Sequence, residues 1–213
     1  MTTDTTILDG LDFAAPAYAV SDEVADLLFR EARTVGQFTD EPVSDEELAA
    51  VYDLAKWGPT ALNTTPLRLL VVRSPEARDR LAKHVADGNR ERVLAAPVTL
   101  VVASDPGFHR TLPVLAPHMA QLADALDPQV EQREQMARTN TLIQVGYLIV
   151  ALRAAGLDAG PMGGFDPAGV DAEFLAENGW KSQLLVNVGH RQGAGTPHAR
   201  AARLSYDEGN LTV

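Results

Sequence analysis

The sequence predicts a single α/β or α+β domain. Capped helical segments alternate along the chain with short apolar runs of the kind that form buried strands. The 213 residues are 46% apolar and 22% charged, which is the composition of a folded globular protein. Because no internal repeat or low-complexity linker divides the chain, we expect one domain over residues 21–213, preceded by an arm over residues 1–20.

Two capped helices open the domain. Ser21 is placed to cap a first helix that ends near Arg33, because apolar residues follow it at helical spacing. Ser44–Glu47 form a capping box, in which a serine hydroxyl and a glutamate three residues later satisfy free amides of the first helical turn. The second helix then continues to Gly58-Pro59, which ends it.

Two strands and a proline-rich stretch follow. Leu67–Arg73 and Val98–Ser104 are continuous apolar runs, which is the pattern of strands buried on both faces. Ser74-Pro75 begins a helix between them. Residues 105–136 contain four prolines that break any long helix into pieces, and an irregular stretch of this length favours a functional lid.

The last third of the chain begins with its most apolar helix. Residues Arg138–Ala155 are apolar almost all round, which predicts a helix at the centre of the core or at a subunit interface. Asp166-Pro167 begins a short helix that ends near Asn178-Gly179, and Leu184–Val188 is a third strand. The tail over residues 193–213 has no clear period.

Charge and composition exclude several classes of function. With 18 basic and 29 acidic residues the formal net charge is −11, so phosphate backbones and anionic lipid surfaces would be repelled. The absence of cysteine removes disulfides, thiolate metal ligands and thiol nucleophiles. The start of the chain lacks a basic n-region and no apolar run could span a bilayer, so we expect a cytoplasmic protein that binds neither nucleic acid nor membrane.

Signatures of direct side-chain catalysis are also missing. The five histidines are far apart without an HExxH pattern, so no metal site is expected. The chain has no GxSxG, Walker A or GxGxxG motif. This poverty of reactive side chains favours an organic cofactor that carries the chemistry.

Three segments could hold a phosphorylated cofactor. They are Arg33-Thr34 with the following residues to Phe38, the polar loop over residues 57–66, and the glycine-rich turn over residues 160–166. Each has a simpler alternative: an arginine that neutralises a helix end, an Asx turn at Asn63, and an ordinary turn before a helix.

Taken together and in this order, the segments resemble the FMN-dependent nitroreductase family. The resemblance extends from about Arg30 to Tyr206 and is closest to the malonic semialdehyde reductases of pyrimidine degradation. The stretches that carry it are Lys56–Thr60, Leu112-Pro113 through Pro117-His118, Tyr147–Ala151, Gly160–Met162 with Gly164–Asp166, and Arg200 with Arg203–Ser205.

The resemblance implies an α+β sandwich with a central mixed sheet, and an intertwined homodimer that holds FMN at its interface. It implies NAD(P)H as co-substrate, with hydride passing through flavin N5 to a small acceptor by a ping-pong mechanism and no catalytic protein side chain. The family match assigns to FMN binding Arg33, Thr34, Gln37, Pro59, Thr60, Ala61, Asn63, Pro161, Met162, Gly163, Gly164, Arg200 and Arg203.

This chain departs from the family pattern at three positions. Many relatives carry a second basic residue where it has Gln37, a serine where it has Val35, and a glutamate where it has Gly163. Phosphate binding is therefore expected to depend more on the remaining arginines than on Gln37.

The branch resemblance implies reduction of 3-oxopropanoate (malonic semialdehyde) to 3-hydroxypropanoate. The carboxylate of that substrate would require a positive or donor group, for which Arg110 and His118 are candidates; a solvated arginine and an interface histidine are the simpler alternative. A broad-specificity nitro or quinone reductase, a flavin-binding protein without NAD(P)H turnover, and an interaction domain that has lost its cofactor remain open.

Overall fold

A computed structural model of the chain describes residues 18–213, which fall into two compact units: residues up to Ala32, and Arg33–Val213. The arm expected over residues 1–20 lies almost wholly outside the described residues, and its boundary stays a prediction. In the first unit, α1 (Asp22–Ala25) continues into a π-helical turn, η1 (Asp26–Arg30). Ser21 caps it as expected, and the helix ends three residues before Arg33.

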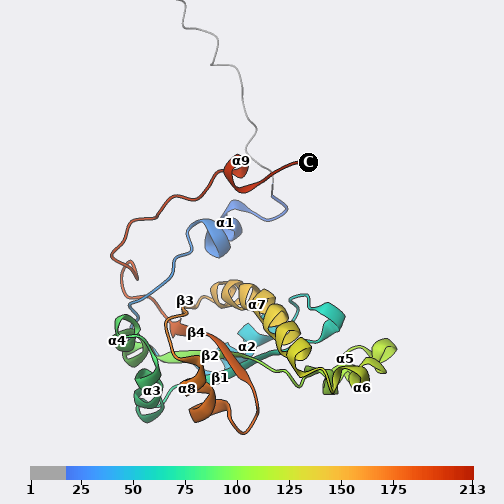
Figure 1. The fold of residues 1–213 in the computed structure, drawn as a ribbon. Coiled ribbons are helices and arrows are strands. Elements are labelled where there is room, and N and C mark those ends of the chain that lie inside the picture. The colour runs from blue at the N-terminus through green and yellow to red at the C-terminus, as the bar shows by residue number, and fades with distance from the viewer. Residues whose placement is uncertain (1–17) are drawn as a thin grey trace, which may run out of the picture. The chain divides into compact units, whose positions relative to one another are not determined.

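A four-stranded sheet forms the centre of the second unit (Figure 1). Its spatial order is β1 (Leu67–Val72), β2 (Val98–Ser104), β4 (Lys181–Gly189) and β3 (Asp158–Met162). The expected α+β fold is confirmed, but every pairing among these strands is antiparallel, so the expectation of a mixed sheet is wrong for the described residues. Between β1 and β2 the chain passes through two helices rather than one, which returns it to the end of the sheet that it left.

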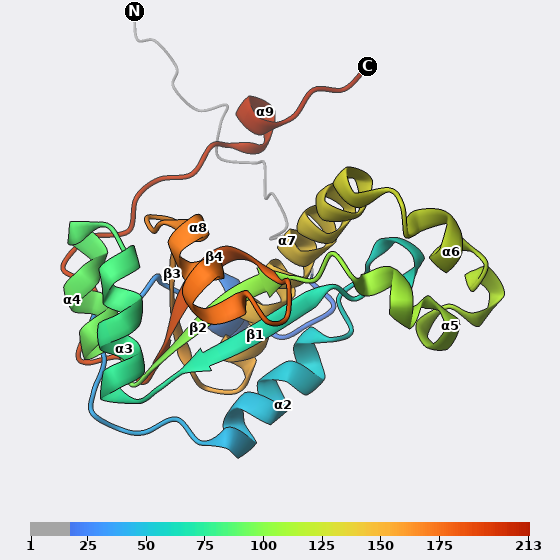
Figure 2. The ribbon, with the colours of Figure 1, turned by 60° about the horizontal axis from the view of Figure 1, so that its bottom comes forward.

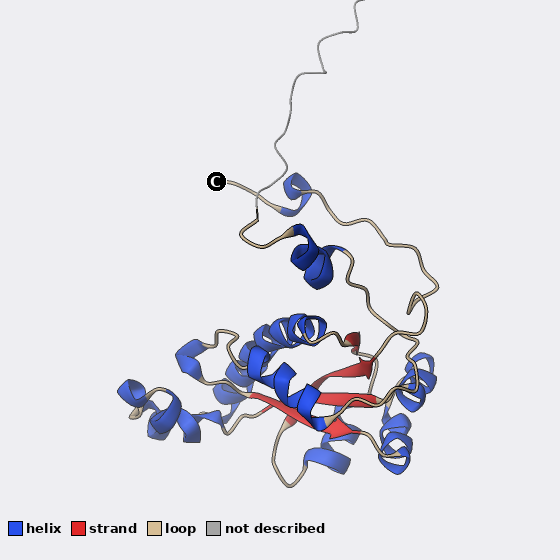
Figure 3. Cartoon of the chain, turned by 180° about the vertical axis from the view of Figure 1, so that it is seen from behind, coloured by secondary structure: helices blue, strands red, loops and turns tan. Residues whose placement is uncertain are grey.

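Helices cover both faces of the sheet, which confirms the predicted sandwich (Figures 2 and 3). One face packs against α2 (Asp45–Ala55) and α7 (Val130–Ala154), and the other against α3 (Pro75–Leu81), α4 (Asp87–Ala95) and α8 (Pro167–Val170). Along β2, Leu100 and Val102 enter the first core, whereas Val101 and Ala103 enter the second. The alternation follows from the two-residue period of a strand. Short turns complete the second unit: η2 (Ala61–Asn63), η3 (Ala82–His84), η6 (Asp171–Leu175) and α9 (Tyr206–Gly209).

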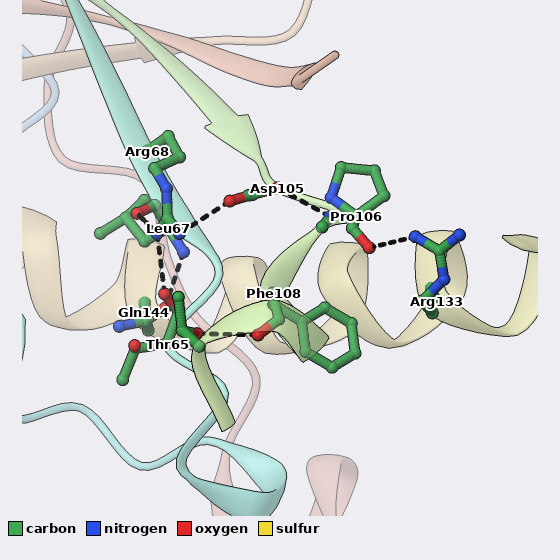
Figure 4. Close-up of polar contacts among 10 residues, drawn as sticks. Thr65, Leu67, Arg68, Asp105, Pro106, Phe108, Arg133 and Gln144 are labelled. Atoms are coloured by element: carbon green, nitrogen blue, oxygen red, sulfur yellow. Dashed lines mark hydrogen bonds and ion pairs between the residues drawn. The ribbon is translucent and has the colours of Figure 1, made fainter. Parts of the chain in front are cut away.

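The proline-rich stretch forms a helical excursion beside the sheet rather than one long helix, as predicted. Its elements are η4 (Phe108–Thr111), α5 (Leu112–Leu115), η5 (Pro117–Met119) and α6 (Leu122–Leu126). They have a small core of their own, in which Phe108 and Leu112 are fully buried. The guanidinium of Arg133 in α7 donates to the carbonyl oxygens of Pro106 (2.7 Å, Figure 4) and Leu126 (3.0 Å), so one side chain fixes both ends of the excursion.

Several boundaries differ from the expectations. Helix α7 begins at Val130 rather than Arg138. The prediction missed its first two turns because they are polar and carry no apolar period. Helix α4 and strand β3 were not expected; β3 contains Gly160 and Pro161, which disfavour strands, so its pairing with β4 must fix its conformation. Strand β1 is only half-buried because it lies at an edge of the sheet, so the prediction that both its faces are buried is wrong.

None of the helices in the described part of the chain is long and apolar enough to cross a membrane.

Candidate functional site

The first predicted cofactor segment lies directly against the third. The N–H of Val35 donates to the carbonyl oxygen of Ala159 in β3 (3.0 Å). A Cβ at Gly160 would lie 2.3 Å from the carbonyl oxygen of Val35, a separation that real Cβ atoms do not show. Glycine at position 160 therefore lets the chain around Val35 cross β3, and it brings residues 33–37 beside residues 160–164, which are more than 120 positions away in sequence.

The same segment borders a hollow of about 490 Å³. Thr34, Gly36 and Gln37 form one wall, α4 contributes Arg92, and residues 195–198 form another wall. The amides of Gly36 and Gln37 both donate to the carbonyl oxygen of Gly195, at 2.9 and 3.3 Å, which holds the two walls together. The hollow is thus lined by polar and small residues from three parts of the second unit.

Two arginines flank this hollow. Arg33 Nη2 donates to the carbonyl oxygen of His198 (2.7 Å), which places its guanidinium at the rim. Arg92 is a lining residue, and its Nε lies 3.5 Å from the position that a Cβ at Gly36 would take. The main chain of Arg92 is fixed separately, because its carbonyl oxygen accepts from Asn187 Nδ2 (2.9 Å). Glu91 of α4 also lines the hollow, so one carboxylate stands beside these two guanidinium groups.

Sequence reasoning did not select Arg92. It lies in a helix that the apolar period did not reveal, since α4 has only one buried residue, Val93. The charge pattern of residues 87–92 alone resembles a solvated helix face. Only the packing of α4 beside residues 34–37 brings this guanidinium to the candidate site.

The third segment offers an open glycine between fixed neighbours. Pro161 and Met162 are the last residues of β3, and Gly164 is anchored through its carbonyl oxygen, which accepts from Ala86 N (2.9 Å) and Asn89 Nδ2 (3.1 Å). Gly163 is exposed, and nothing lies within 4 Å of the position that its Cβ would occupy. The strand end is therefore rigid while the Gly163 backbone stays accessible to a flat ligand.

The second segment is a strained loop between α2 and β1. Leu62, Asn63 and Thr65 have φ values of 57°, 52° and 37°, which non-glycine residues rarely adopt and which cost about 1–3 kcal/mol each. The surrounding residues hold this loop: Asn140 Oδ1 of α7 accepts from Ala61 N (2.7 Å), and Thr60 Oγ1 accepts from Thr65 N (3.1 Å). Such strain persists only where neighbouring contacts fix it, and it is common at functional sites.

Two further contacts lock the start of β1 beneath this loop (Figure 4). Gln144 Oε1 of α7 accepts from Leu67 N (3.1 Å). Arg68 donates to the carbonyl oxygen of Thr65 (2.9 Å) and pairs with Asp105 (2.7 Å). The loop therefore has a defined shape at one edge of the sheet.

The chain does not bring the second segment to the other two. The loop precedes β1, whereas residues 33–37 and 161–164 lie at β3, and β2 and β4 separate these two edge strands. At about 4.8 Å between neighbouring strands, the two edges are roughly 14 Å apart. Asn63 instead donates through Nδ2 to the carbonyl oxygen of Leu115 in the excursion (2.8 Å).

The remaining predicted residues stay apart from the hollow. Arg110 and His118 are exposed positions of the excursion, and neither is among the residues that line the hollow. Arg203 is exposed, and its Nη1 donates to the carbonyl oxygens of Ala201 (3.1 Å) and Ala202 (3.0 Å). Arg200 is exposed in the same tail. The roles of these four residues stay predictions. Among the described residues, no group of three histidine or carboxylate side chains could hold a metal ion.

Comparisons with known proteins agree on one family. The model of the nitroreductase family matches residues 29–190, which is most of the chain. The chain belongs to the nitroreductase family. A protein of Streptomyces coelicolor is 50% identical over 188 residues, covering 88% of this chain and 95% of its own; a Streptomyces griseus protein is 48% identical with the same coverage. Both carry the provisional name NADH dehydrogenase/NAD(P)H nitroreductase.

A solved structure shows the same fold. A nitroreductase-type protein of Exiguobacterium sibiricum, crystallised in complex with FMN, superposes with a TM-score of 0.70 at 21% identity and covers 88% of this chain and 96% of its own. At this identity the likeness establishes the fold alone. The family expectation drawn from the sequence motifs is confirmed; the names of these relatives do not mention malonic semialdehyde.

Proposed function

We propose that this protein is an FMN-dependent NAD(P)H oxidoreductase that reduces a small acceptor. The observation that carries the proposal is that residues 34–37 and Arg92 border a hollow beside β3, the edge strand that leads directly into the open Gly163 backbone. Family membership supports it, and so do relatives named for NAD(P)H and a fold neighbour crystallised with FMN.

The residues present fit a flavin mononucleotide. The rim and wall of the hollow supply Arg33 and Arg92, the kind of cation that binds a phosphate through two parallel hydrogen bonds. Thr34 and Gln37 add polar groups for the ribityl chain beside them. Gly163 has no side chain to obstruct a tricyclic ring, and no other atom stands within 4 Å of its Cβ position. When bound, FMN would supply the acceptance and donation of hydride, which no side chain here can perform.

The protein itself would then bind the cofactor, orient it and keep its surroundings fixed. Asn89 and Ala86 hold the Gly163–Gly164 turn, so its amides stay fixed as charge develops on a bound ring. A fixed amide needs no reorganisation during the reaction, which is why such donors contribute strongly to rate. The polar hollow would hold the phosphate end, so that Arg33, Arg92, Thr34 and Gln37 would orient the cofactor and leave its ring open to nicotinamide and acceptor.

We further propose that the site is completed by a second copy of the chain. In one copy the strained loop over residues 60–65 lies across the sheet from the other two segments. Apolar side chains beside this loop are exposed: Trp57 (78%), Ile143 (44%) and Tyr147 (46%). A homodimer that buries this face would lay the loop of one copy, with Pro59, Thr60, Ala61 and Asn63, on the site of the other.

For the acceptor we propose 3-oxopropanoate, with reduction to 3-hydroxypropanoate. Its support is the set of branch motifs in the sequence, including Leu112-Pro113 and Pro117-His118, which the excursion presents near the strained loop. A broad nitro or quinone reductase is the second candidate, because the names of the similar Streptomyces proteins include NAD(P)H nitroreductase.

One experiment tests both the flavin-dependent activity and the proposed acceptor. The purified protein is supplied with FMN, and NADH and NADPH oxidation are followed with 3-oxopropanoate, menadione or a nitrofuran as acceptor. We expect a yellow protein that oxidises a nicotinamide fastest with 3-oxopropanoate. Equal rates on all three acceptors would reject the specific substrate. A protein that takes up FMN without oxidising either nicotinamide would reject the enzyme, and one that stays colourless would reject the cofactor.

A further inference from the structure

A cluster of charged side chains lies next to the segment that holds the Gly163–Gly164 turn, and the proposed function does not use it. It joins Arg80 of α3, His84 of η3 and Glu173 of η6. Arg80 Nε lies 2.7 Å from Glu173 Oε1, and His84 Nε2 contacts Glu173 Oε2. His84 and Glu173 are only 21% and 26% exposed, so this carboxylate is held in a largely enclosed place between two donors.

The cluster is built into the packing rather than lying loosely on the surface. The hydrogen bond from Arg80, followed by that from His84, lowers the pKa of Glu173 below its ordinary value, so Glu173 is a carboxylate at neutral pH. The Arg80 guanidinium also stacks over the Phe174 ring, 4.6 Å from its centroid. A Cβ at Gly169 would lie 2.3 Å from His84 Nδ1. The His84 ring therefore occupies space that any other residue at position 169 would fill.

The backbone that carries His84 also holds the glycine turn. The carbonyl oxygen of His84 accepts from Asp166 N (2.6 Å), and two residues later Ala86 N donates to the carbonyl oxygen of Gly164 (2.9 Å). Between them Val85 and Phe165 form an antiparallel bridge. Residues 84–86 thus form a short antiparallel pairing, here called the 84–86 segment, with residues 164–166. The His84 side chain attaches this segment to Glu173.

We infer that His84, held by Glu173, which Arg80 anchors in turn, is a positioning residue that sets where the Gly163–Gly164 turn stands, and through it the electron affinity of the bound flavin. The inference rests on the proposed function for its flavin part. The His84 ring is fixed on one side by Glu173 and on the other by Gly169, so the 84–86 segment has one position. The Gly163–Gly164 turn is paired with this segment and is therefore fixed with it. A purely structural role would stabilise the fold without changing the turn or the flavin.

The test compares His84→Ala and His84→Gln with Lys83→Ala. Glutamine can still donate to Glu173 from a similar place, whereas alanine cannot; Lys83 is an exposed neighbour in the same turn. Hydrogen exchange of the Phe165 and Asp166 amides, which donate to the carbonyl oxygens of Gly163 (3.1 Å) and His84 (2.6 Å), is measured in flavin-free protein. We expect at least tenfold faster exchange in His84→Ala, and exchange within twofold of the parent in His84→Gln and Lys83→Ala.

The second measurement is the two-electron midpoint potential of the FMN-loaded proteins. We expect His84→Ala to lower it by about 30 mV, the equivalent of a tenfold change in equilibrium constant, because a less fixed amide stabilises the reduced ring less. Unchanged exchange in His84→Ala would overturn the inference, as would faster exchange with an unchanged potential. If the parent binds no FMN, the proposed function fails while the exchange experiment still decides whether His84 positions the turn.

Discussion

The contribution of Arg92 to cofactor binding can be isolated, because α4 provides a matched control two residues earlier. Arg92 lines the hollow, whereas Arg90 does not; Arg90 is exposed, and its contact with Asp87 is long at 4.0 Å. Arg92→Ala and Arg90→Ala therefore remove the same charge from the same helix. Truncating Arg92 keeps its carbonyl oxygen, which accepts from Asn187 and Ala96, so we expect the fold to be retained.

The magnitude follows from the hydrogen bonds that a guanidinium makes to a phosphate. Such bonds contribute about 1.5–3 kcal/mol each, and about 1.4 kcal/mol corresponds to a tenfold change in dissociation constant. Because Arg92 is exposed, we take the lower end of this range. Arg92→Ala should weaken FMN binding about tenfold, and Arg90→Ala should change it less than twofold.

Titration of flavin fluorescence with each variant measures the effect, with riboflavin as a second ligand that lacks the phosphate. Arg92→Ala should leave the affinity for riboflavin unchanged. If riboflavin binding falls as much as FMN binding, Arg92 does not meet the phosphate. If the two variants lose equal affinity for FMN, the effect is long-range charge alone and the reasoning from the hollow is refuted.

Three other outcomes are expected. Gly160→Ala should lower the free energy of unfolding in urea by about 2 kcal/mol or more, because its Cβ would meet the backbone oxygen of Val35. The control Gly163→Ala should change it by less than about 0.5 kcal/mol. Similar losses in both variants would contradict the crossing of Val35 over β3. Hydrogen bonds from the Ser44 backbone and side chain lower the pKa of Glu47, so the stability from this carboxylate is fully present above its ordinary unfolded pKa and is lost as the pH falls through the lower folded pKa. Glu47→Gln should therefore be less stable than the parent at pH 7, and the difference should vanish in the acid limb of a pH series; a constant difference would show that the carboxylate charge is irrelevant. Ile143→Glu should give a monomer by analytical ultracentrifugation that no longer binds FMN, and a flavin-binding monomer would refute a site shared between copies.

Local signals in the sequence determined much of the fold. The capping box at Ser44 is present, β2 spans the predicted residues, and the prolines break the excursion into short turns. These features depend mainly on neighbours in the chain: a cap satisfies amides three residues away, and an apolar run of strand length favours a strand, although β1 shows that its burial depends on its place in the sheet. The family motifs likewise predicted the family, which the comparisons confirm, and proposed three candidate cofactor segments.

Tertiary structure decided what local signals could not contain. Strand β3 forms because β4 pairs with it, and position 160 must be glycine only because Val35 crosses it. Arg92 becomes a candidate phosphate ligand only because α4 packs beside Gly36, although its own helix has almost no apolar face. Contacts between residues far apart in sequence depend on which surfaces meet after folding. The local pattern of apolar and polar residues does not specify those surfaces.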